Sequence, residues 1–238
     1  MENLINKVIQ GDCLEVMKQI PDKSIDMILC DLPYGTTACK WDTIIPFEPL
    51  WKQYKRIIKD NGAIVLTASQ PFTSALVMSN PKGFKYNFVW IKPQGVDPFM
   101  AKIRPLNNIE DILVFSNGKL NYFPQMAKGK PYHVIRDKKP RIKKTNNTTM
   151  RQTETTNTGE RLPVRTLNFR QEKGLHPTQK PVALFEYLVK TYTNEGDLVL
   201  DNCAGSGTTG VACKNLNRNY ILIEKEQEYI DIINKRLQ

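Results

Sequence analysis

The stretch DLVLDNCAGSGTTG, residues 197–210, decides the fold class of this chain. An apolar segment ends on Asp201, a glycine-rich turn follows, and the next residues suit a helix. Residues 205–210 fit the pattern GxGxxG, and the strand-like segment NYILIE that comes next ends on Glu224. In α/β domains such glycines let the backbone approach a nucleotide, and an acid at the end of the next strand accepts hydrogen bonds from ribose hydroxyls. The stretch therefore predicts an α/β domain with a nucleotide-like ligand at this turn.

The rest of the chain repeats the alternation of strands and helices. Seven apolar segments have the length of strands, at 7–12, 24–31, 63–69, 86–93, 109–118, 197–201 and 219–224. Between them we expect helices at 13–20, 48–59, 71–78 and 181–193, from 208 onward and at the end of the chain. Asn61-Gly62 is expected to end the helix at 48–59. This order predicts a doubly wound, mostly parallel α/β sheet of seven strands, with 86–93 and 109–118 as an antiparallel pair at its edge.

The composition suits a globular protein, with 40% hydrophobic residues and no apolar run as long as a membrane span. Because the N-terminus also lacks the apolar stretch of a signal peptide, we expect a soluble, cytoplasmic protein. The five cysteines form no CxxC pair, and His133 and His176 are the two histidines, so neither a metal site nor a disulfide framework is expected. Cys30 and Cys203 are predicted to be small core residues.

The charge of the chain indicates a polyanionic partner. Lys and Arg number 34 against 24 Asp and Glu, which gives a net charge of +10. Between residues 128 and 144 there are eight Lys or Arg residues and one acid, Asp137. The following residues are rich in Thr and Asn and have no apolar period, so 119–175 is expected to be an inserted region with a polar loop. A basic loop in solvent would have the same composition, and that alternative stays open here.

Three carboxylates are expected to gather near the glycine-rich turn: Asp12, Asp201 and Glu224, each at the end of a predicted strand. Such a cluster repels a pyrophosphate but attracts a sulfonium cation that carries an ammonium group. The charges therefore favour S-adenosylmethionine. NAD stays an alternative, although a dinucleotide needs both halves of the sheet and a single strand follows the turn.

A second motif, ILCDLPYGTT at residues 28–37, ends a buried strand on a carboxylate, a kink and an aromatic ring. These groups suit a flat, amine-bearing base. The amine lone pair is delocalised into the ring until the nitrogen becomes tetrahedral, and two acceptors aimed at its hydrogens favour that change. Asp31 and a backbone carbonyl could serve as the acceptors and stabilise the developing positive charge. A base in a duplex must be flipped out to reach such a pocket.

Three motifs together resemble a known family. DLPYG, 31–35, resembles the catalytic DPPY-type motif of amino-group DNA methyltransferases, and DNCAGSGTTG resembles their S-adenosylmethionine motif. HPTQKP, 176–181, with the helix after it, is similar to the segment that precedes the cofactor motif in the β class. The order, with the catalytic motif first and the cofactor motif last, also matches that class. The resemblance covers 9–117 and 174–238, and it implies the Rossmann-like methyltransferase fold.

The resemblance implies roles for individual residues. Asp31 and the Leu32 carbonyl would bind the target amine, while Pro33 and Tyr34 shape its pocket. The implied cofactor residues are Asp12, Cys13, Asp31, His176, Thr178, Lys180, Asp201, Cys203, Gly205, Gly207, Thr208 and Glu224. The basic residues expected to bind DNA phosphates are Lys138, Lys139, Arg141, Lys143 and Lys144.

Two departures from the family pattern concern fine geometry. Leu32 replaces the first proline of the catalytic motif, and Asn202-Cys203 replaces the aromatic lead of the cofactor motif. Asp31 favours adenine N6 as the target, because N4-cytosine enzymes of the family more often carry Ser there. Cytosine N4 is the alternative.

The expected organisation has a catalytic half at 1–117, a target-recognition region at 118–175 and a cofactor-binding half at 176–238. Double-stranded DNA is the expected partner, and the resemblance also implies a homodimer. Three rivals stay open: an NAD-dependent oxidoreductase, a nucleic-acid-binding module without activity, and a methyltransferase that acts on RNA or protein. In the last class the cofactor motif usually comes first.

Overall fold

The structure is a computed structural model that describes residues 3–37, 39, 42–96, 98–135, 154–172, 174 and 179–238. The chain forms two compact units. The larger one combines Met1–Phe123 with Arg165–Gln238, and the smaller one is Pro124–Val164. The smaller unit lies inside the expected insertion at 118–175 but is shorter, because the residues that flank it pack with the larger unit.

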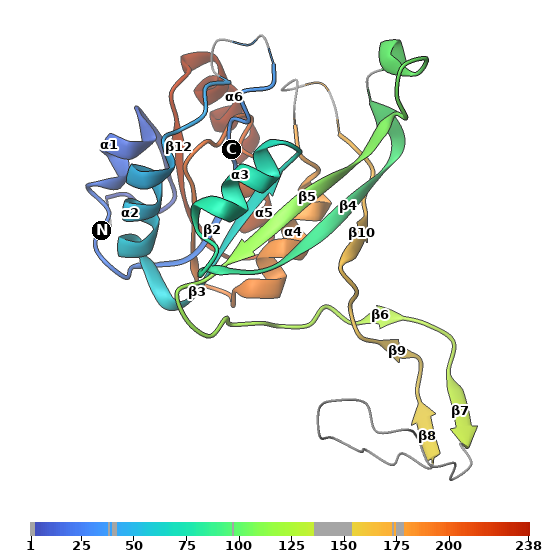
Figure 1. Ribbon diagram of the computed structural model, residues 1–238. Coiled ribbons are helices and arrows are strands. Elements are labelled where there is room, and N and C mark those ends of the chain that lie inside the picture. Colours follow the sequence, from blue (N-terminus) through green and yellow to red (C-terminus); the bar gives the residue numbers. More distant parts are fainter. Residues whose placement is uncertain are drawn as a thin grey trace. The chain divides into compact units, whose positions relative to one another are not determined.

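The larger unit is built on one sheet whose described part has eight strands, in the order β1-β12-β11-β2-β3-β5-β4-β10 (Figure 1). Their bounds are β1 (Lys7–Gln10), β2 (Ile25–Asp31), β3 (Ile58–Ala68), β4 (Phe84–Val96), β5 (Asn107–Phe115), β10 (Thr166–Asn168), β11 (Leu198–Asp201) and β12 (Asn219–Glu224). The neighbours β1, β12, β11, β2 and β3 pair in parallel, each with the next in this order. Strand β5 is antiparallel to both β3 and β4. The doubly wound α/β class is confirmed, and β10 adds an eighth strand that the sequence did not predict.

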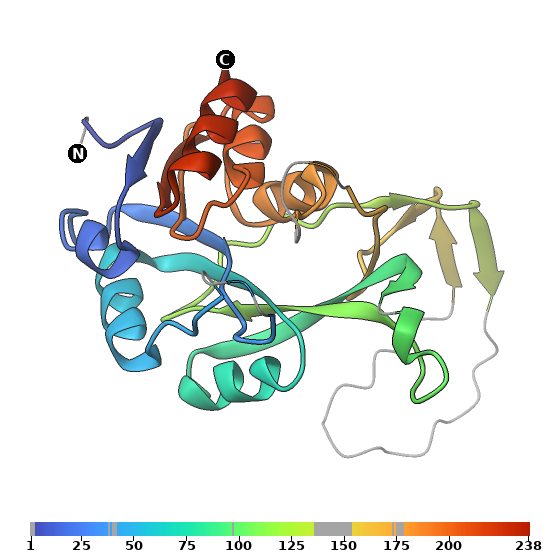
Figure 2. The same ribbon diagram turned by 90° about the horizontal axis from the view of Figure 1, so that it is seen from above.

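Helices cover both faces of this sheet (Figure 2). Their bounds are α1 (Cys13–Met17), α2 (Phe47–Ile57), α3 (Phe72–Ser79), α4 (Val182–Tyr192), α5 (Thr208–Asn215) and α6 (Gln227–Leu237), with a short 3₁₀ helix at Pro98–Met100. One core lies between the sheet and α1, α2 and α3, and α4 and α5 pack on the opposite face. Helix α2 buries one apolar stripe: Leu50, Trp51, Tyr54 and Ile57 are at most 4% exposed.

The expectation that Asn61-Gly62 ends a helix is wrong. Helix α2 ends at Ile57, and β3 begins at Ile58 and continues through both residues. The register of β2 with β3 shifts between Ile25, which pairs with Ile58, and Met27, which pairs with Ala63. A Cβ at position 62 would lie 2.8 Å from the Asp26 carbonyl oxygen, so glycine lets the two backbones approach at this register shift.

The smaller unit consists of antiparallel pairs, β6 (Ala127–Lys128) with β9 (Glu160–Arg161), and β7 (Tyr132–Ile135) with β8 (Glu154–Asn157). The Arg161 guanidinium lies 4.9 Å from the centre of the Tyr132 ring, within cation–π range. The five basic residues predicted to bind DNA all fall in 136–153, outside the described residues. Among the helices that the structure describes, none has both the length and the apolar character needed to span a bilayer.

The topology decides where a ligand binds. From β2 the chain continues to β3 on one side, whereas from β11 it continues to β12 on the other, and β2 and β11 are neighbours. In doubly wound sheets the ligand crevice lies at this switch point, outside the carboxyl ends of the strands. Asp31 ends β2 and Asp201 ends β11, so two of the predicted site residues meet there.

Candidate active site

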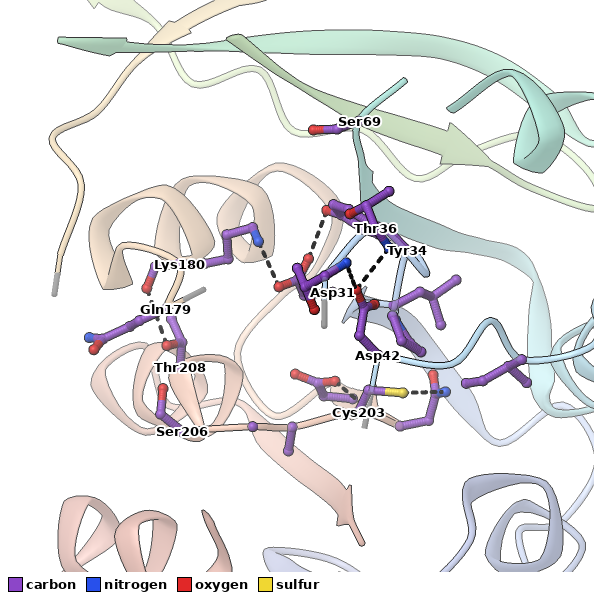
Figure 3. Close-up of a pocket in the computed structure, with 18 of the residues that line it drawn as sticks. Asp31, Tyr34, Thr36, Asp42, Ser69, Gln179, Lys180, Cys203, Ser206 and Thr208 are labelled. Atoms are coloured by element: carbon purple, nitrogen blue, oxygen red, sulfur yellow. Dashed lines mark hydrogen bonds and ion pairs between the residues drawn. The ribbon is translucent and has the colours of Figure 1, made fainter. Parts of the chain in front are cut away.

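A pocket of about 1030 Å³ opens at the carboxyl ends of β1, β2, β11 and β12, and all its lining residues belong to the larger unit (Figure 3). Asp12, Cys13, Cys203, Gly205 and Glu224 line one part of it. The other part is lined by residues of the DLPYG turn and by Lys92, Glu110 and Lys180. The pocket therefore brings the two predicted motifs together, although they are far apart in the chain.

Glycine is required in the turn that precedes α5. Gly205 and Gly207 have φ angles of 51° and 78°, in the left-handed region that other residues rarely adopt. A Cβ at Gly207 would also lie 2.9 Å from Ile233 of α6. The turn can adopt this path because both positions lack a side chain, and α6 then packs closely against it.

Two carboxylates hold the backbone around this turn. Glu224 accepts hydrogen bonds from the backbone N–H of Gly205 at 2.8 Å and from that of Lys225 at 2.7 Å. Asp201 accepts from the backbone N–H of Cys203 at 3.1 Å and from the Thr209 hydroxyl at 2.5 Å. Burial raises the pKa of Asp201 to about 7, so a cation placed beside it would favour its ionised form.

Asp12 and Cys13 form the wall next to β1. The Asp12 side chain caps α1 and accepts a hydrogen bond from the Leu14 N–H at 2.9 Å. Cys13 is 9% exposed, and its hydrogen bond with Cys203 lowers the Cys13 thiol pKa. Cys203 is half-buried and lines the pocket, whereas Cys30 is fully buried, and burial raises the Cys30 pKa to about 12.

Asp31 lies in a dense polar network on the other side of the pocket (Figure 3). Its Oδ1 accepts a hydrogen bond from the Thr67 hydroxyl and lies 2.8 Å from the Tyr34 hydroxyl oxygen. Its Oδ2 lies 2.6 Å from the Lys180 ammonium nitrogen. The Tyr34 ring stacks on Phe72 with 5.1 Å between centroids, so Phe72 covers one of its faces. Leu32 and Pro33 line the pocket beside these groups.

Glu110 on β5 extends this network. One of its oxygens lies 3.1 Å from the Lys180 nitrogen, and the other lies 2.7 Å from the Lys92 nitrogen. Burial alone would lower the pKa of Lys180, but the charges of Asp31 and Glu110 outweigh it and raise that pKa. Lys180 therefore stays charged within the pocket.

Asp42 fixes the loop that follows Tyr34. Its carboxylate accepts backbone hydrogen bonds from Gly35 at 2.8 Å, Thr36 at 2.9 Å and Thr37 at 2.7 Å. Burial opposes the charge of Asp42, but a hydrogen bond from the Thr37 side chain, together with these backbone hydrogen bonds, prevails and lowers the pKa of Asp42.

Most of the predicted cofactor residues lie at the pocket, and two lie outside the described residues. Asp12, Cys13, Asp31, Lys180, Asp201, Cys203, Gly205, Thr208 and Glu224 line the pocket, and Gly207 shapes its turn. Lys180 meets Asp31 with its side chain, and its backbone carbonyl accepts a hydrogen bond from Thr208 at 3.2 Å. His176 and Thr178 lie outside the described residues.

Sequence reasoning missed several residues of the site. Thr67, Lys92 and Glu110 come from β3, β4 and β5, and Asp42 comes from the loop after the DLPYG turn. Tyr54 belongs to the apolar stripe of α2, yet its hydroxyl donates to Asn202 Oδ1 at 2.5 Å beside the glycine-rich turn. A charged residue inside an apolar strand, as Glu110 is in NNIEDILVF, is the signal that could have indicated a buried partner.

Comparison with known proteins agrees with this geometry. The family model N6_N4_Mtase, described as DNA methylase, matches residues 25–235. The type II methyltransferase M.HinfI of Haemophilus influenzae is 31% identical over 264 aligned positions, which cover 100% of this chain and 70% of M.HinfI. M.HpaI of Haemophilus parainfluenzae is 29% identical, and that match covers 97% of this chain and 74% of M.HpaI.

Solved structures show the same fold. The complex of M1.HpyAVI with S-adenosylmethionine has a TM-score of 0.65 and 28% identity, and the match covers 97% of this chain and 99% of M1.HpyAVI. The cytosine-N4-specific PvuII DNA methyltransferase has a TM-score of 0.70 at 18% identity, with coverage of 98% and 86%, and supports the fold alone. The chain belongs to the N6/N4 DNA methylase family. It is a DNA methyltransferase, and the methyl donor of this class is S-adenosylmethionine.

Proposed function

We propose that this protein transfers the methyl group of S-adenosylmethionine to the N6 amine of an adenine in double-stranded DNA. The observation that carries the proposal is the Asp31 carboxylate, which ends β2 in the pocket next to Asp201 at the end of β11. Because a paired base cannot enter a pocket, the adenine must be flipped out of the helix. The aspartate at position 31 supports adenine as the target, because N4-cytosine members of the family more often carry Ser at this position.

The chemistry of the pocket fits a nucleoside cofactor with positive charge. When bound, S-adenosylmethionine supplies an electrophilic methyl group on its sulfonium sulfur. We assign Glu224 to the ribose of the cofactor. Its Oε2 accepts one backbone hydrogen bond, and its second lone pair can accept a hydrogen bond from a ribose hydroxyl. We assign the methionine part to Asp201, Cys203, Gly205, Gly207 and Thr208, and the adenine end to Asp12 and Cys13. His176, Thr178 and Lys180 keep the cofactor role that the resemblance implies.

Asp31 and the Leu32 carbonyl are assigned to the target amine. Two acceptors directed at its hydrogens favour a tetrahedral nitrogen, whose lone pair is then available for attack. The Asp31 charge stabilises the positive charge that develops on the nitrogen. Pro33 and Tyr34 form the wall of this part of the pocket.

DNA binding is assigned to the inserted region 118–175. Lys138, Lys139, Arg141, Lys143 and Lys144 are proposed to contact phosphates, because residues 128–144 carry eight basic residues and one acid. A homodimer stays a prediction from the resemblance, and light scattering of the purified protein measures it.

Mass spectrometry of nucleosides tests the proposal. Unmethylated DNA is incubated with the protein and S-adenosylmethionine, beside an Asp31→Ala control. N6-methyladenine with the wild type and none with the variant is the expected result. N4-methylcytosine would keep the catalytic assignment and replace the substrate. A product that the variant also forms would remove Asp31 from the catalytic role.

A further inference from the structure

Four charged side chains form a cluster at the DLPYG turn: Asp31 and Lys92 are half-buried, and Lys180 and Glu110 are buried. Lys180 lies 2.6 Å from Asp31 and 3.1 Å from Glu110, and Lys92 lies 2.7 Å from the other Glu110 oxygen. The side chains of Lys180, Glu110 and Lys92 are 7%, 5% and 11% exposed. Water and salt screen the interactions between these charges less here than on the surface, so each charge changes the electrostatic energy of its neighbours.

Hydroxyl groups connect the two carboxylates as well. The Tyr34 oxygen lies 2.8 Å from Asp31 and 3.0 Å from Glu110, and Thr67 donates to Asp31. Tyr34 has a single hydroxyl hydrogen, so it donates to one carboxylate at a time. With Thr67 and Tyr34 on Oδ1 and Lys180 on Oδ2, Asp31 keeps one lone pair of Oδ2 for a further donor.

This arrangement raises an electrostatic problem for amine methylation. Positive charge develops on the target nitrogen next to Asp31, and the Lys180 ammonium beside the same carboxylate opposes that charge. If Lys180 paired with Asp31 and with no other carboxylate, its positive charge would neutralise the negative charge of Asp31. Glu110 adds a second negative charge on Lys180, and its own counterion, Lys92, lies on the oxygen of Glu110 that does not contact Lys180.

We propose that Glu110 is a positioning residue for methyl transfer: it shares Lys180 with Asp31, so that the Asp31 carboxylate stays negative toward the target amine. The inference rests on methyl transfer to an amine at Asp31, whichever base carries that amine. Glu110 is not among the residues assigned to the cofactor, and Lys180, which is among them, stays in place when Glu110 is changed. Its removal should therefore slow the chemical step and leave cofactor binding unchanged.

Single-turnover methyl transfer to unmethylated plasmid DNA, with the enzyme in excess, tests this role. The variants are Glu110→Gln, Lys180→Met and the double variant. Glu110→Gln is expected to lower the transfer rate roughly tenfold to a hundredfold, the order for one buried unit charge acting across several ångströms. The dissociation constant for S-adenosylmethionine, measured by calorimetry, is expected to stay at its wild-type value.

The double variant separates positioning from a structural effect. If Glu110 acts through Lys180, then Glu110→Gln has no further effect on the rate once Lys180 is Met, and the two changes are non-additive. Additive effects, or a wild-type rate in Glu110→Gln, would overturn the proposal. Total methyl incorporation is counted irrespective of base, and the identity of the methylated base is a separate readout that tests the adenine assignment alone.

A charge-balanced variant keeps the test valid if Glu110→Gln does not fold. Lys92→Met with Glu110→Gln removes one cation and one anion from the cluster, so no unpaired Lys92 is left buried. Its transfer rate is expected to fall as in Glu110→Gln. A wild-type rate in this folded variant would also overturn the proposal.

Discussion

The Lys180 ammonium nitrogen lies 2.6 Å from Asp31 Oδ2, although 149 residues separate the two in the chain. The backbone carbonyl of Lys180 also accepts the hydroxyl hydrogen of Thr208, at the start of α5. One residue thus contacts both the DLPYG turn and the glycine-rich turn. Lys180 therefore links the two turns, since its ammonium group binds one and its backbone carbonyl binds the other.

Removal of the Asp31 charge should stop catalysis without unfolding the pocket. Asp31→Asn keeps the shape of the side chain, and methyl transfer is expected to fall by about a hundredfold or more, as for other preorganised transition-state groups. Single-turnover methylation measures the rate, and calorimetry measures retained cofactor binding. Asp60→Asn is the matched control, because Asp60 is an exposed carboxylate paired with Lys23 at 3.0 Å. Equal rates in the two variants would contradict the catalytic role.

Cofactor affinity should rise with pH through the titration of Asp201. Its pKa is raised to about 7 in the free protein, and a cationic ligand favours the ionised form, so binding releases a proton below that pH. The affinity is expected to increase by at most about tenfold per pH unit between about pH 5.5 and 7. Calorimetry should stay below about pH 7, because the cofactor's α-amino group titrates at about 7.7–8.0. Asp201→Asn should bind more weakly and without this pH dependence, and an unchanged slope would rule out Asp201 as its source.

Alanine at Gly207 should cost more stability than alanine at Gly196. Both glycines have positive φ, 78° and 82°, so the left-handed backbone costs about 1–2 kcal/mol in each variant. A Cβ at Gly207 would also lie 2.9 Å from Ile233, whereas nothing lies within 4 Å of one at Gly196. The free energy of unfolding of each variant is measured with urea, and the difference between the two losses gives the cost of the contact between a Cβ at position 207 and α6. Equal losses would show that Ile233 moves aside without cost.

Loss of Asp42 should release the loop after the catalytic turn. Asp42→Ala leaves three backbone N–H groups without their acceptor and is expected to destabilise the fold by about 1.5–3 kcal/mol. The Asp42 pKa is lowered from 3.8, so its contribution is present above that pH and is lost as the pH falls through the lower, folded-state value. Urea unfolding at neutral and acidic pH measures both effects. The wild type and Asp42→Ala should converge in stability at acidic pH, and a constant difference would contradict the assignment.

Substitution of the residues predicted to bind phosphates should change the salt dependence of DNA binding. For Lys143→Ala with Lys144→Ala, the slope of log K against log salt is expected to become shallower by about 0.9 for each phosphate that is no longer neutralised. Fluorescence anisotropy over a salt series measures it. Lys82→Ala is the control, because Lys82 is exposed and precedes β4, away from the carboxyl ends of the parallel strands. An unchanged slope in the double variant would place the phosphate-binding residues elsewhere.

Much of the site was predictable because it depends on where strands end. Asp31, Asp201 and Glu224 each follow an apolar segment, and the carboxyl ends of neighbouring parallel strands meet at one edge of a sheet. The glycines of the cofactor turn were predictable too, since a left-handed φ is a local property of one residue. These features need no knowledge of distant contacts.

The errors arose where distant segments pair. Asn61-Gly62 has the composition of a turn, but both residues lie inside β3, where its register with β2 shifts. Strand β10 has three residues, too few for a periodic pattern, and it forms because β4 offers a free edge. Pairing across a sheet depends on the partner strand, which the local sequence does not specify.

The sequence by itself determined the fold class, the family resemblance and the two turns that meet in the pocket, because alternation, glycine positions and motif order are written along the chain. Tertiary structure alone decided that Lys180 pairs with both Asp31 and Glu110, and that Glu110 also pairs with Lys92. Those charges come from separate elements. Folding brings them within hydrogen-bond distance, where burial makes each one depend on the others.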